Sequence, residues 1–535
     1  MKFDDIVTQY LGEFGRYQKI QFILVVIPTI FCAFHSLSWT FTAPNIAHRC
    51  RLESEATLTR PNYQIGPNLL LNGCENQTET EQCSYKSCSF SDGTACKFGY
   101  AYADTSRYTA VERWDLVCDK HVLKPIVQTA YYIGQFFGSL VFGFLGDRYG
   151  RKKIFLAAIA IQFISGIGMS LANGWYLFAF FRMWAGFAHP GIFMTSVILG
   201  MELIGSSYRS LASIFAGALF STGQAILGTV AYFVTDYRML QIYLTLPLVI
   251  FITYIWLIPE SARWLVSQRR YEEADKILRM VAKRNGRQMP EKWWDELEID
   301  VDMASPSRKR KKNFLDLLKT PKARVRTLVM FFCWPVVSMA YYGMSMKPDL
   351  LGTDPYINFI AGGIAEIPAT IFMFFTVDKL GRRPLLCGGL ILAGLTLFSN
   401  VFVSENTWEA IPMIQFLLSK ASLTLCYAVI YAYTPELFPT EIRNMAVGGC
   451  SMMARFGASG ASFMVMHLAE VYGRNVITIP FGLSVILAAL LVGLTLPETA
   501  NHAMLETIKE LEGNRSNDEK MIPLTPQGKS LIDQE

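Results

Sequence analysis

The chain has 535 residues, of which 52% are hydrophobic and 17% are charged, with a formal net charge of +5 at neutral pH. Its mean hydropathy is positive, at +0.27. Soluble globular chains carry a larger share of charge, so this composition excludes an ordinary soluble protein and favours one that lies in a membrane. We therefore expect membrane lipid around the chain and no nucleic-acid partner.

Twelve apolar runs lie along the chain, each close to the length of about 20 residues that a membrane-spanning helix needs. The first six cover residues 20–41, 126–145, 154–172, 175–199, 211–234 and 240–258. The other six cover residues 327–344, 356–377, 385–403, 411–433, 445–468 and 476–496. Residues 1–19 lack the basic flank of a cleaved signal, so the first run is expected to remain as a helix.

The segment between the first two runs, residues 43–122, is rich in cysteine. It holds six of the eleven cysteines: Cys50, Cys74, Cys83, Cys88, Cys96 and Cys118. In an oxidising compartment these would pair as up to three disulfides, whereas the lack of a paired C-x-x-C spacing disfavours a zinc site. Asn76 begins a glycosylation sequon in the same segment. Both features predict an extracellular loop, and the pairing of the cysteines stays open.

Short motifs of the first half return in the same order in the second half. GDRYGRK at residues 146–152 is matched by DKLGRR at 378–383, and Pro-Glu at 259–260 returns at 497–498. A glutamate also stands seven residues before an arginine in each half, as Glu202 before Arg209 and as Glu436 before Arg443. The repeat predicts two similar six-helix halves, 20–258 and 327–496.

Lysine and arginine mark the loops that we expect on the cytoplasmic side. The loop after the second run is basic, and the connector 259–326 contains the basic run 308–312. Both are predicted inside, which also places residues 1–19 and the tail 497–535 in the cytoplasm. Apolar residues recur at helical spacing from Tyr271 to Val281, so the connector is predicted to contain a helix.

The sequence contains no motif that indicates enzyme chemistry. A G-x-x-x-x-G-K-[ST] phosphate loop, an H-E-x-x-H zinc motif and a Gly-rich dinucleotide turn are all missing from it. We therefore expect a protein that is no enzyme and holds no cofactor or metal. Twelve spans in two matching halves suit alternating access around a central site better than a receptor bundle.

Several motifs together resemble a known family. GFLGDRYGRK at 143–152 resembles the signature between the second and third helices of the major facilitator superfamily, and PESARWL at 259–265 resembles a stretch of its sugar and organic-ion branches. WDLVC at 114–118, YAYTPELFPT at 431–440 and the cysteine-rich loop are similar to the solute carrier family of organic cation, carnitine and organic anion transporters.

This resemblance implies an all-α membrane protein with the major facilitator fold and twelve transmembrane helices in two pseudo-symmetric halves. It further implies a cytoplasmic gating clasp that holds the halves together in the outward-open state. The residues of this clasp would be Asp147, Arg148, Arg151, Glu202, Arg209, Asp378, Arg382, Glu436 and Arg443. The alternative is that these charges only set topology and solvate helix ends.

Ionisable residues inside the apolar runs are costly, so they are the candidates for substrate contact. They are His35, Arg182, His189, Glu366, Lys420 and Arg455. We expect Arg182 at an interface, the two histidines in packing roles, and Lys420 to extend towards the membrane surface. Glu366 and Arg455 lie deepest, and either they pair with each other or each faces substrate.

The resemblance leaves the substrate open between classes. The stretch around Glu366 resembles the cation and carnitine branches, whereas Arg455 occupies a position where polyspecific cation carriers have aspartate. An acidic group with aromatic faces suits an ammonium, and an arginine suits a carboxylate. The aromatic residues expected to line this site are Trp334, Tyr341, Tyr427, Tyr431 and Phe215.

The sequence thus predicts a polyspecific plasma-membrane carrier of organic cations or zwitterionic quaternary amines, resembling tetraethylammonium or carnitine. Glu366 would receive the ammonium and Arg455 the carboxylate. An organic-anion exchanger is the first alternative, and an amine sensor without transport is a more distant one. Coupling to sodium or protons and assembly into a homo-oligomer both stay open.

Overall fold

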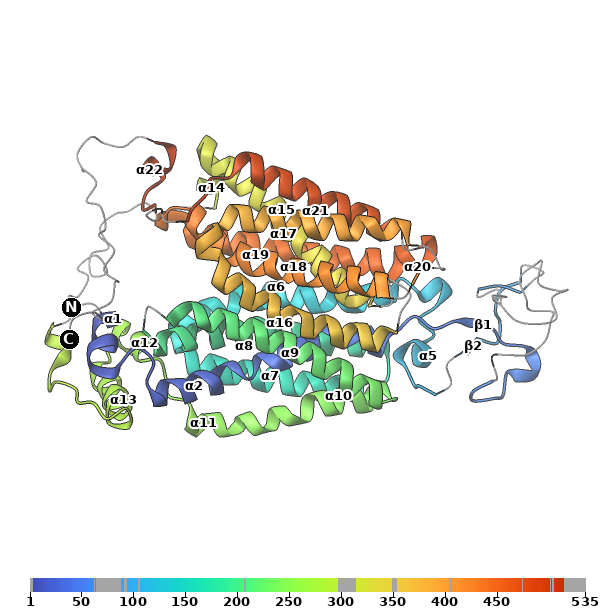
Figure 1. Ribbon diagram of the computed structural model, residues 1–535. Coiled ribbons are helices and arrows are strands. Elements are labelled where there is room, and N and C mark those ends of the chain that lie inside the picture. The colour runs from blue at the N-terminus through green and yellow to red at the C-terminus, as the bar shows by residue number, and fades with distance from the viewer. Residues whose placement is uncertain are drawn as a thin grey trace.

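The computed structural model describes residues 3–61, 63, 88–90, 94–103, 106–205, 208–296, 314–348, 354–403, 407–408, 410–473, 475–500, 502 and 505–513. Long helices run side by side in one bundle, with a small two-stranded sheet at one end and short helices at the other (Figure 1). Helices α1 and α22 lie at the end opposite β1 and β2, so the two described ends of the chain lie at the same end of the bundle.

The first half of the bundle contains six spans. The first is formed by α2 (Arg16–Val26), α3 (Thr29–Leu37) and α4 (Trp39–Thr42). The next four are α6 (Leu123–Tyr149), α7 (Arg151–Leu171), α8 (Trp175–Leu203) and α9 (Arg209–Phe233). The sixth combines α10 (Tyr237–Thr245), the 3₁₀ segment Leu246–Thr253 and α11 (Tyr254–Leu257).

The second half repeats this arrangement. Its spans are α15 (Pro321–Met346), α16 (Pro355–Leu380), α17 (Arg382–Ser399), α18 (Ala410–Leu437), α19 (Thr440–Phe463) and α21 (Asn475–Thr495). A 3₁₀ turn, Asn400–Phe402, extends α17, while the π-helical segment Met464–Leu468 and α20 (Ala469–Tyr472) extend α19. The twelve predicted runs are confirmed, and the largest shift of a start is from residue 327 to Pro321.

Helices α6 and α19 are the least apolar of the twelve. Ten described helical segments are long and apolar enough to cross a membrane by composition, and these two are not among them. They pack against each other across the two halves, as do α9 and α16. Small and polar residues are tolerated in a span that packs against other helices.

The segment between α4 and α6 forms a small folded unit. Strand β1 (His48–Cys50) pairs antiparallel with β2 (Tyr100–Tyr102), and α5 (Ala110–Trp114) and two 3₁₀ turns, Glu53–Glu55 and Cys118–Lys120, complete it. Disulfides join Cys50 to Cys96 and Cys88 to Cys118. Cys74, Cys83 and the sequon at Asn76 lie outside the described residues.

A second small unit caps the opposite end of the bundle. It combines α1 (Phe3–Ile6) and the π-helical segment Val7–Leu11 with α12 (Ala262–Ser267), α13 (Tyr271–Arg284) and the 3₁₀ turn Trp293–Glu296. Their buried apolar residues, among them Leu11, Trp264 and Leu278, pack into one cluster. The short helices α14 (Asp316–Lys319) and α22 (Ile508–Glu512) lie near the start of α15. The basic run 308–312 falls outside the described residues.

Candidate functional site

Glu366 of α16 forms a buried ion pair with Lys420 of α18. The Nζ of Lys420 lies 2.9 Å from Oε1 of Glu366, and the two side chains are 0% and 1% exposed. Ser221 Oγ donates to Glu366 Oε2 at 2.6 Å, and the Tyr341 hydroxyl donates to the same oxygen at 3.1 Å. Because Ser221 belongs to α9, this network joins the two halves in the middle of the bundle.

The structure excludes one of the two alternatives for Glu366 and Arg455, and it contradicts the prediction for Lys420. Glu366 pairs with Lys420 rather than with Arg455, because α16 packs along α18 whereas α19 packs along α15 and α6. Lys420 also does not extend to the membrane surface, since it is fully buried and donates to Ser345 Oγ. A charge of each sign at this depth is better neutralised by a neighbour than by distant solvent.

Four of the predicted aromatic residues form one group on α15 and α18. The ring centroid of Trp334 lies 4.6 Å from that of Tyr431, and the ring centroid of Tyr427 lies 5.7 Å from Tyr431 and 5.6 Å from Tyr341. The ammonium of Lys420 lies 3.7 Å from the centroid of the Tyr341 ring. We call Trp334, Tyr341, Tyr427 and Tyr431 the aromatic group.

The fifth predicted aromatic residue, Phe215, packs elsewhere. Its ring contacts Phe22 of α2 at 5.5 Å between centroids. The structure instead adds Tyr342, which lies 5.3 Å from Tyr341 and 5.4 Å from Tyr132 of α6. Sequence reasoning missed this tyrosine contact between the halves, although the adjacent pairs Tyr131–Tyr132 and Tyr341–Tyr342 were a visible signal.

Arg455 of α19 lies beside the aromatic group and is partly exposed. Its Nη1 donates to the hydroxyl of Ser451, one turn earlier, at 2.6 Å. The hydroxyl-bearing side chains of Tyr431, Tyr427 and Tyr342 lie near its guanidinium. Within the described part of the chain, no carboxylate lies at ion-pair distance from Arg455. A guanidinium with no acidic partner among the described residues suits an acidic group of another molecule.

The other ionisable candidates lie inside the first half. Arg182 is fully buried rather than at an interface: it donates to Gln128 at 2.5 Å and lies 5.4 Å from the ring centroids of both Trp39 and Tyr131. His189 Nδ1 lies 2.8 Å from the Tyr131 hydroxyl. His35 is 0% exposed. The contacts of Arg182 and His189 are those of packing residues.

The predicted gating residues make matching contacts in the two halves. Arg151 lies 2.6 Å from Asp147 and 3.9 Å from Glu202, and Arg382 lies 2.8 Å from Asp378 and 3.1 Å from Glu436. Each of these four ion pairs lies within one half, so none of them joins the halves in this conformation.

The remaining gating candidates contact their own surroundings. Arg148 stacks on the Tyr149 ring at 5.4 Å, and Arg443 donates to the carbonyls of Phe438 and Leu505 at 3.3 Å each. The side chain of Arg209 lies outside the described structure. A clasp between the halves stays a prediction for another conformation.

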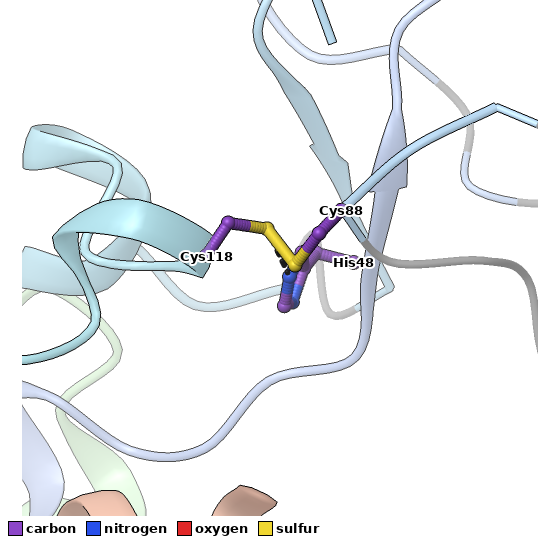
Figure 2. Close-up of side chains that lie close together, drawn as sticks. All are labelled: His48, Cys88 and Cys118. Carbon is purple, nitrogen blue, oxygen red and sulfur yellow. Dashed lines mark hydrogen bonds between the residues drawn. A yellow bond between two sulfur atoms is a disulfide. The ribbon is translucent and has the colours of Figure 1, made fainter. Parts of the chain in front are cut away.

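One group of side chains in the loop has the composition of a metal site. The ligand atoms of His48, Cys88 and Cys118 all lie within 4.8 Å of one another (Figure 2). Cys88 and Cys118 are joined in a disulfide, with their Cα atoms 5.5 Å apart, so neither offers the thiolate that binds a metal. Nothing in this group supports a metal ion.

Comparison with known proteins gives a consistent result. The model of the family described as "Sugar (and other) transporter" matches residues 79–511. The organic cation transporter protein of Drosophila melanogaster is 35% identical, over 96% of this chain and 95% of its own. Solute carrier family 22 member 6 of Danio rerio is 31% identical, over 98% and 97%, and member 3 of Mus musculus is 30% identical, over 95% of each chain.

Solved structures agree on the fold. The xylose transporter XylE from E. coli in a partially occluded inward open conformation has a TM-score of 0.61 at 17% identity, covering 91% of this chain and 99% of its own. Its inward open conformation has a TM-score of 0.58 at 16% identity, covering 92% and 99%.

Proposed function

This chain belongs to the solute carrier family of organic cation, carnitine and organic anion transporters within the major facilitator superfamily, and we propose that it carries zwitterionic quaternary amines and organic cations by alternating access. The central site of the second half would bind the substrate. Arg455 receives the carboxylate where one is present, and the aromatic group receives the ammonium beside the Glu366–Lys420 ion pair.

The observation that carries this proposal is the unequal compensation of the central charges. Glu366 is neutralised by Lys420, whereas Arg455 lies beside aromatic rings with no described carboxylate at ion-pair distance. A simple cation that entered this site would meet the uncompensated charge of Arg455. A carboxylate-bearing ammonium would neutralise Arg455 and place its cationic head against Trp334, Tyr427 and Tyr431.

The same observation supports a second candidate, an exchanger of organic anions. In that case Arg455 is the primary contact, Lys420 adds a second positive charge, and Glu366 serves only to hold Lys420. The two candidates differ in one requirement, because only the zwitterion needs the aromatic group to bind a cationic head.

The proposal includes a place and an orientation. The protein is a plasma-membrane carrier, with the disulfide-bonded unit between α4 and α6 outside and both chain ends in the cytoplasm. The disulfides Cys50–Cys96 and Cys88–Cys118 support this orientation, because they persist in an oxidising compartment, and the basic loops support the opposite end as cytoplasmic. We refer below to the end with β1 and β2 as the outer end.

Uptake into cells that express the chain tests the proposal. Labelled carnitine, tetraethylammonium and para-aminohippurate are compared, each with and without external sodium and at two external pH values. Time-dependent uptake of carnitine that Arg455→Gln strongly reduces supports the zwitterion, and the ion comparison identifies any coupling to sodium or protons. Uptake of para-aminohippurate alone would establish the anion exchanger, and binding of amines without accumulation would leave only a sensor.

Glu366→Gln tests the remaining assignment. If the glutamate supplies the negative charge for the ammonium, this variant reduces uptake of tetraethylammonium more than uptake of para-aminohippurate. Unchanged cation uptake and affinity in Glu366→Gln would remove Glu366 from the proposed site.

A further inference from the structure

Four ionisable side chains at the outer end join the two halves of the bundle. His121 lies just before α6 and Lys124 in its first turn, both in the first half. His467 lies in the π-helical segment after α19 and Glu470 in α20, which belongs to the second half and lies near the β1–β2 end (Figure 1). We call these four residues the outer cluster.

The outer cluster forms a continuous chain of polar contacts. Lys124 Nζ lies 3.1 Å from Oε1 of Glu470, and Oε2 of the same carboxylate contacts Nε2 of His121. The other ring nitrogen of His121, Nδ1, lies 2.9 Å from Nδ1 of His467. The side chains of Lys124, His121 and Glu470 are 2%, 12% and 13% exposed, so little water competes for these bonds.

The contact between the two imidazoles limits how many protons the cluster can hold. A hydrogen bond between two Nδ1 atoms needs a proton on one of them and a lone pair on the other. With both rings neutral, His121 donates from Nε2 to Glu470 and accepts from His467 at Nδ1. With one ring protonated, the bond also forms. When both rings are protonated, two N–H groups point at each other and the bond cannot exist.

The net charge of the outer cluster also predicts that protonation weakens the contact between the halves. With neutral imidazoles, Lys124 and Glu470 balance each other. Two imidazolium rings would leave the cluster with two uncompensated positive charges across a poorly solvated contact between the halves, which favours separation.

We propose that the outer cluster is a proton-sensitive latch that holds the outer end closed and opens when its second histidine is protonated. Imidazole is the side chain that exchanges protons most readily between pH 5 and 8. The latch therefore closes at neutral external pH and weakens in an acidic medium, so that acid shifts the carrier towards its outward-open conformation.

The other charged groups around the latch act in the same direction or face water. Burial lowers the pKa of His48 on β1, with Lys124 and His121 lowering it further, so His48 gains its proton at lower pH and then adds positive charge. Lys347, after α15, lines a cavity of about 100 Å³ together with Glu470. Asp119 and Lys120, next to His121, are both exposed.

A cysteine beside the latch reports its opening without any substrate. Thr40 on α4 lines the same cavity as Glu470 and is 9% exposed. Its hydroxyl has no hydrogen-bond partner among the described residues, so Thr40→Cys is a mild change. Cells with this variant are labelled by a membrane-impermeant methanethiosulfonate reagent at external pH 7.5 and 5.5. Thr57 in the loop is exposed, so Thr57→Cys serves as the control that measures how pH alone changes the labelling rate.

The latch predicts that the labelling rate of Thr40→Cys, divided by that of Thr57→Cys, rises at least threefold from pH 7.5 to 5.5. Adding His467→Gln abolishes this response, because an amide can bond to His121 in either protonation state. His502→Gln is the matched control: this exposed histidine contacts only the nearby Ala500 carbonyl in the described structure and should leave the response unchanged.

Several results would overturn the latch. They are an equal normalised rate at both pH values, a pH response that survives His467→Gln, or one that His502→Gln removes. Glu470→Gln should give fast labelling at both pH values, because it breaks the ion pair with Lys124. Ala43→Cys, which lines the same cavity and is 5% exposed, replaces Thr40→Cys if that variant does not reach the surface.

Discussion

Arg151 of the first half and Arg382 of the second make the same contacts, each with an aspartate four residues earlier and with a glutamate near the end of another helix. In the middle of the bundle the halves differ. There the first half holds Arg182 among neutral partners within the described structure, while the second holds the Glu366–Lys420 pair and Arg455. The repeat thus preserves the helix ends, and the charges that we propose for substrate binding are concentrated in one half.

The largest expected effect breaks the ion pair that distinguishes the second half. Lys420→Met leaves the buried carboxylate of Glu366 without its cation, which should cost about 3–5 kcal/mol of stability. We expect a clear fall in melting temperature of the purified protein and less of it at the cell surface. The double variant Lys420→Met, Glu366→Gln should regain most of this loss, because it removes both charges. Lys97→Met, at an exposed lysine, is the control. A double variant as unstable as the single one would show that the pair is not the cause.

Arg455→Gln changes the other charge of the second half and should affect uptake rather than stability. Losing a hydrogen-bonded charge contact with a carboxylate costs about 1.5–3 kcal/mol, so carnitine uptake at low concentration should fall by about tenfold or more. Arg324→Gln, an exposed arginine in the first turn of α15, should leave uptake unchanged. The role of Arg455 is contradicted if both variants transport equally well.

The sequence was a good guide to the helices. Twelve apolar runs sufficed for the fold, because a bilayer forces each span into a helix of nearly fixed length. Glu366 and Arg455 could be singled out as candidates because a charged group in an apolar run has few structural explanations, and four of the five predicted aromatic residues form one group.

The partners of those charges could not be read from the sequence. Glu366 pairs with Lys420 because α16 lies beside α18, and neighbour relations between helices are a tertiary property that hydropathy does not encode. Phe215 was misplaced for the same reason, since its ring faces α2 rather than α18. The outer cluster could not be predicted from the sequence, because His121 and Lys124 lie more than 340 residues before His467 and Glu470.

The matching helix ends allow a direct test of the repeat. Gly150 and Gly381 precede α7 and α17 with φ values of 102° and 91°, a conformation that an L side chain rarely adopts. A Cβ would also meet the carboxylate of Glu260 at the first and of Glu498 at the second. Gly150→Ala and Gly381→Ala should therefore each lower stability by about 1–2 kcal/mol, measured as melting temperature. Gly388→Ala, inside α17 with open space around it, should not. A large effect at one glycine and none at the other would break the equivalence of the two ends.

The smallest expected effect concerns the carboxylate at the start of α17. Glu498 accepts hydrogen bonds from the backbone N–H groups of Arg382 and Arg383, at 3.0 Å each. Burial alone would raise its pKa, but these bonds and those from Thr499 and Ala500 hold the pKa below its ordinary value. Because the pKa of Glu498 is lowered in the folded state, its ionised carboxylate stabilises the fold at pH values above the ordinary pKa, which is about 4. This stabilisation is lost as the pH falls from there towards the pKa of the folded state.

Glu498→Gln should consequently lower the melting temperature slightly at pH 7, in line with the roughly 0.3–1 kcal/mol of an anion at a helix N-terminus. The difference between variant and parent should shrink at pH 4, where the parent begins to lose the same charge. Glu260→Gln at the start of α7 removes the equivalent acceptor of the Lys152 N–H, at 2.9 Å, and should give a similar loss at pH 7. If Glu498→Gln lowers the melting temperature as much at pH 4 as at pH 7, the carboxylate acts through hydrogen-bond geometry rather than through its charge. The starts of α7 and α17 would then be alike in hydrogen bonding and not in electrostatics.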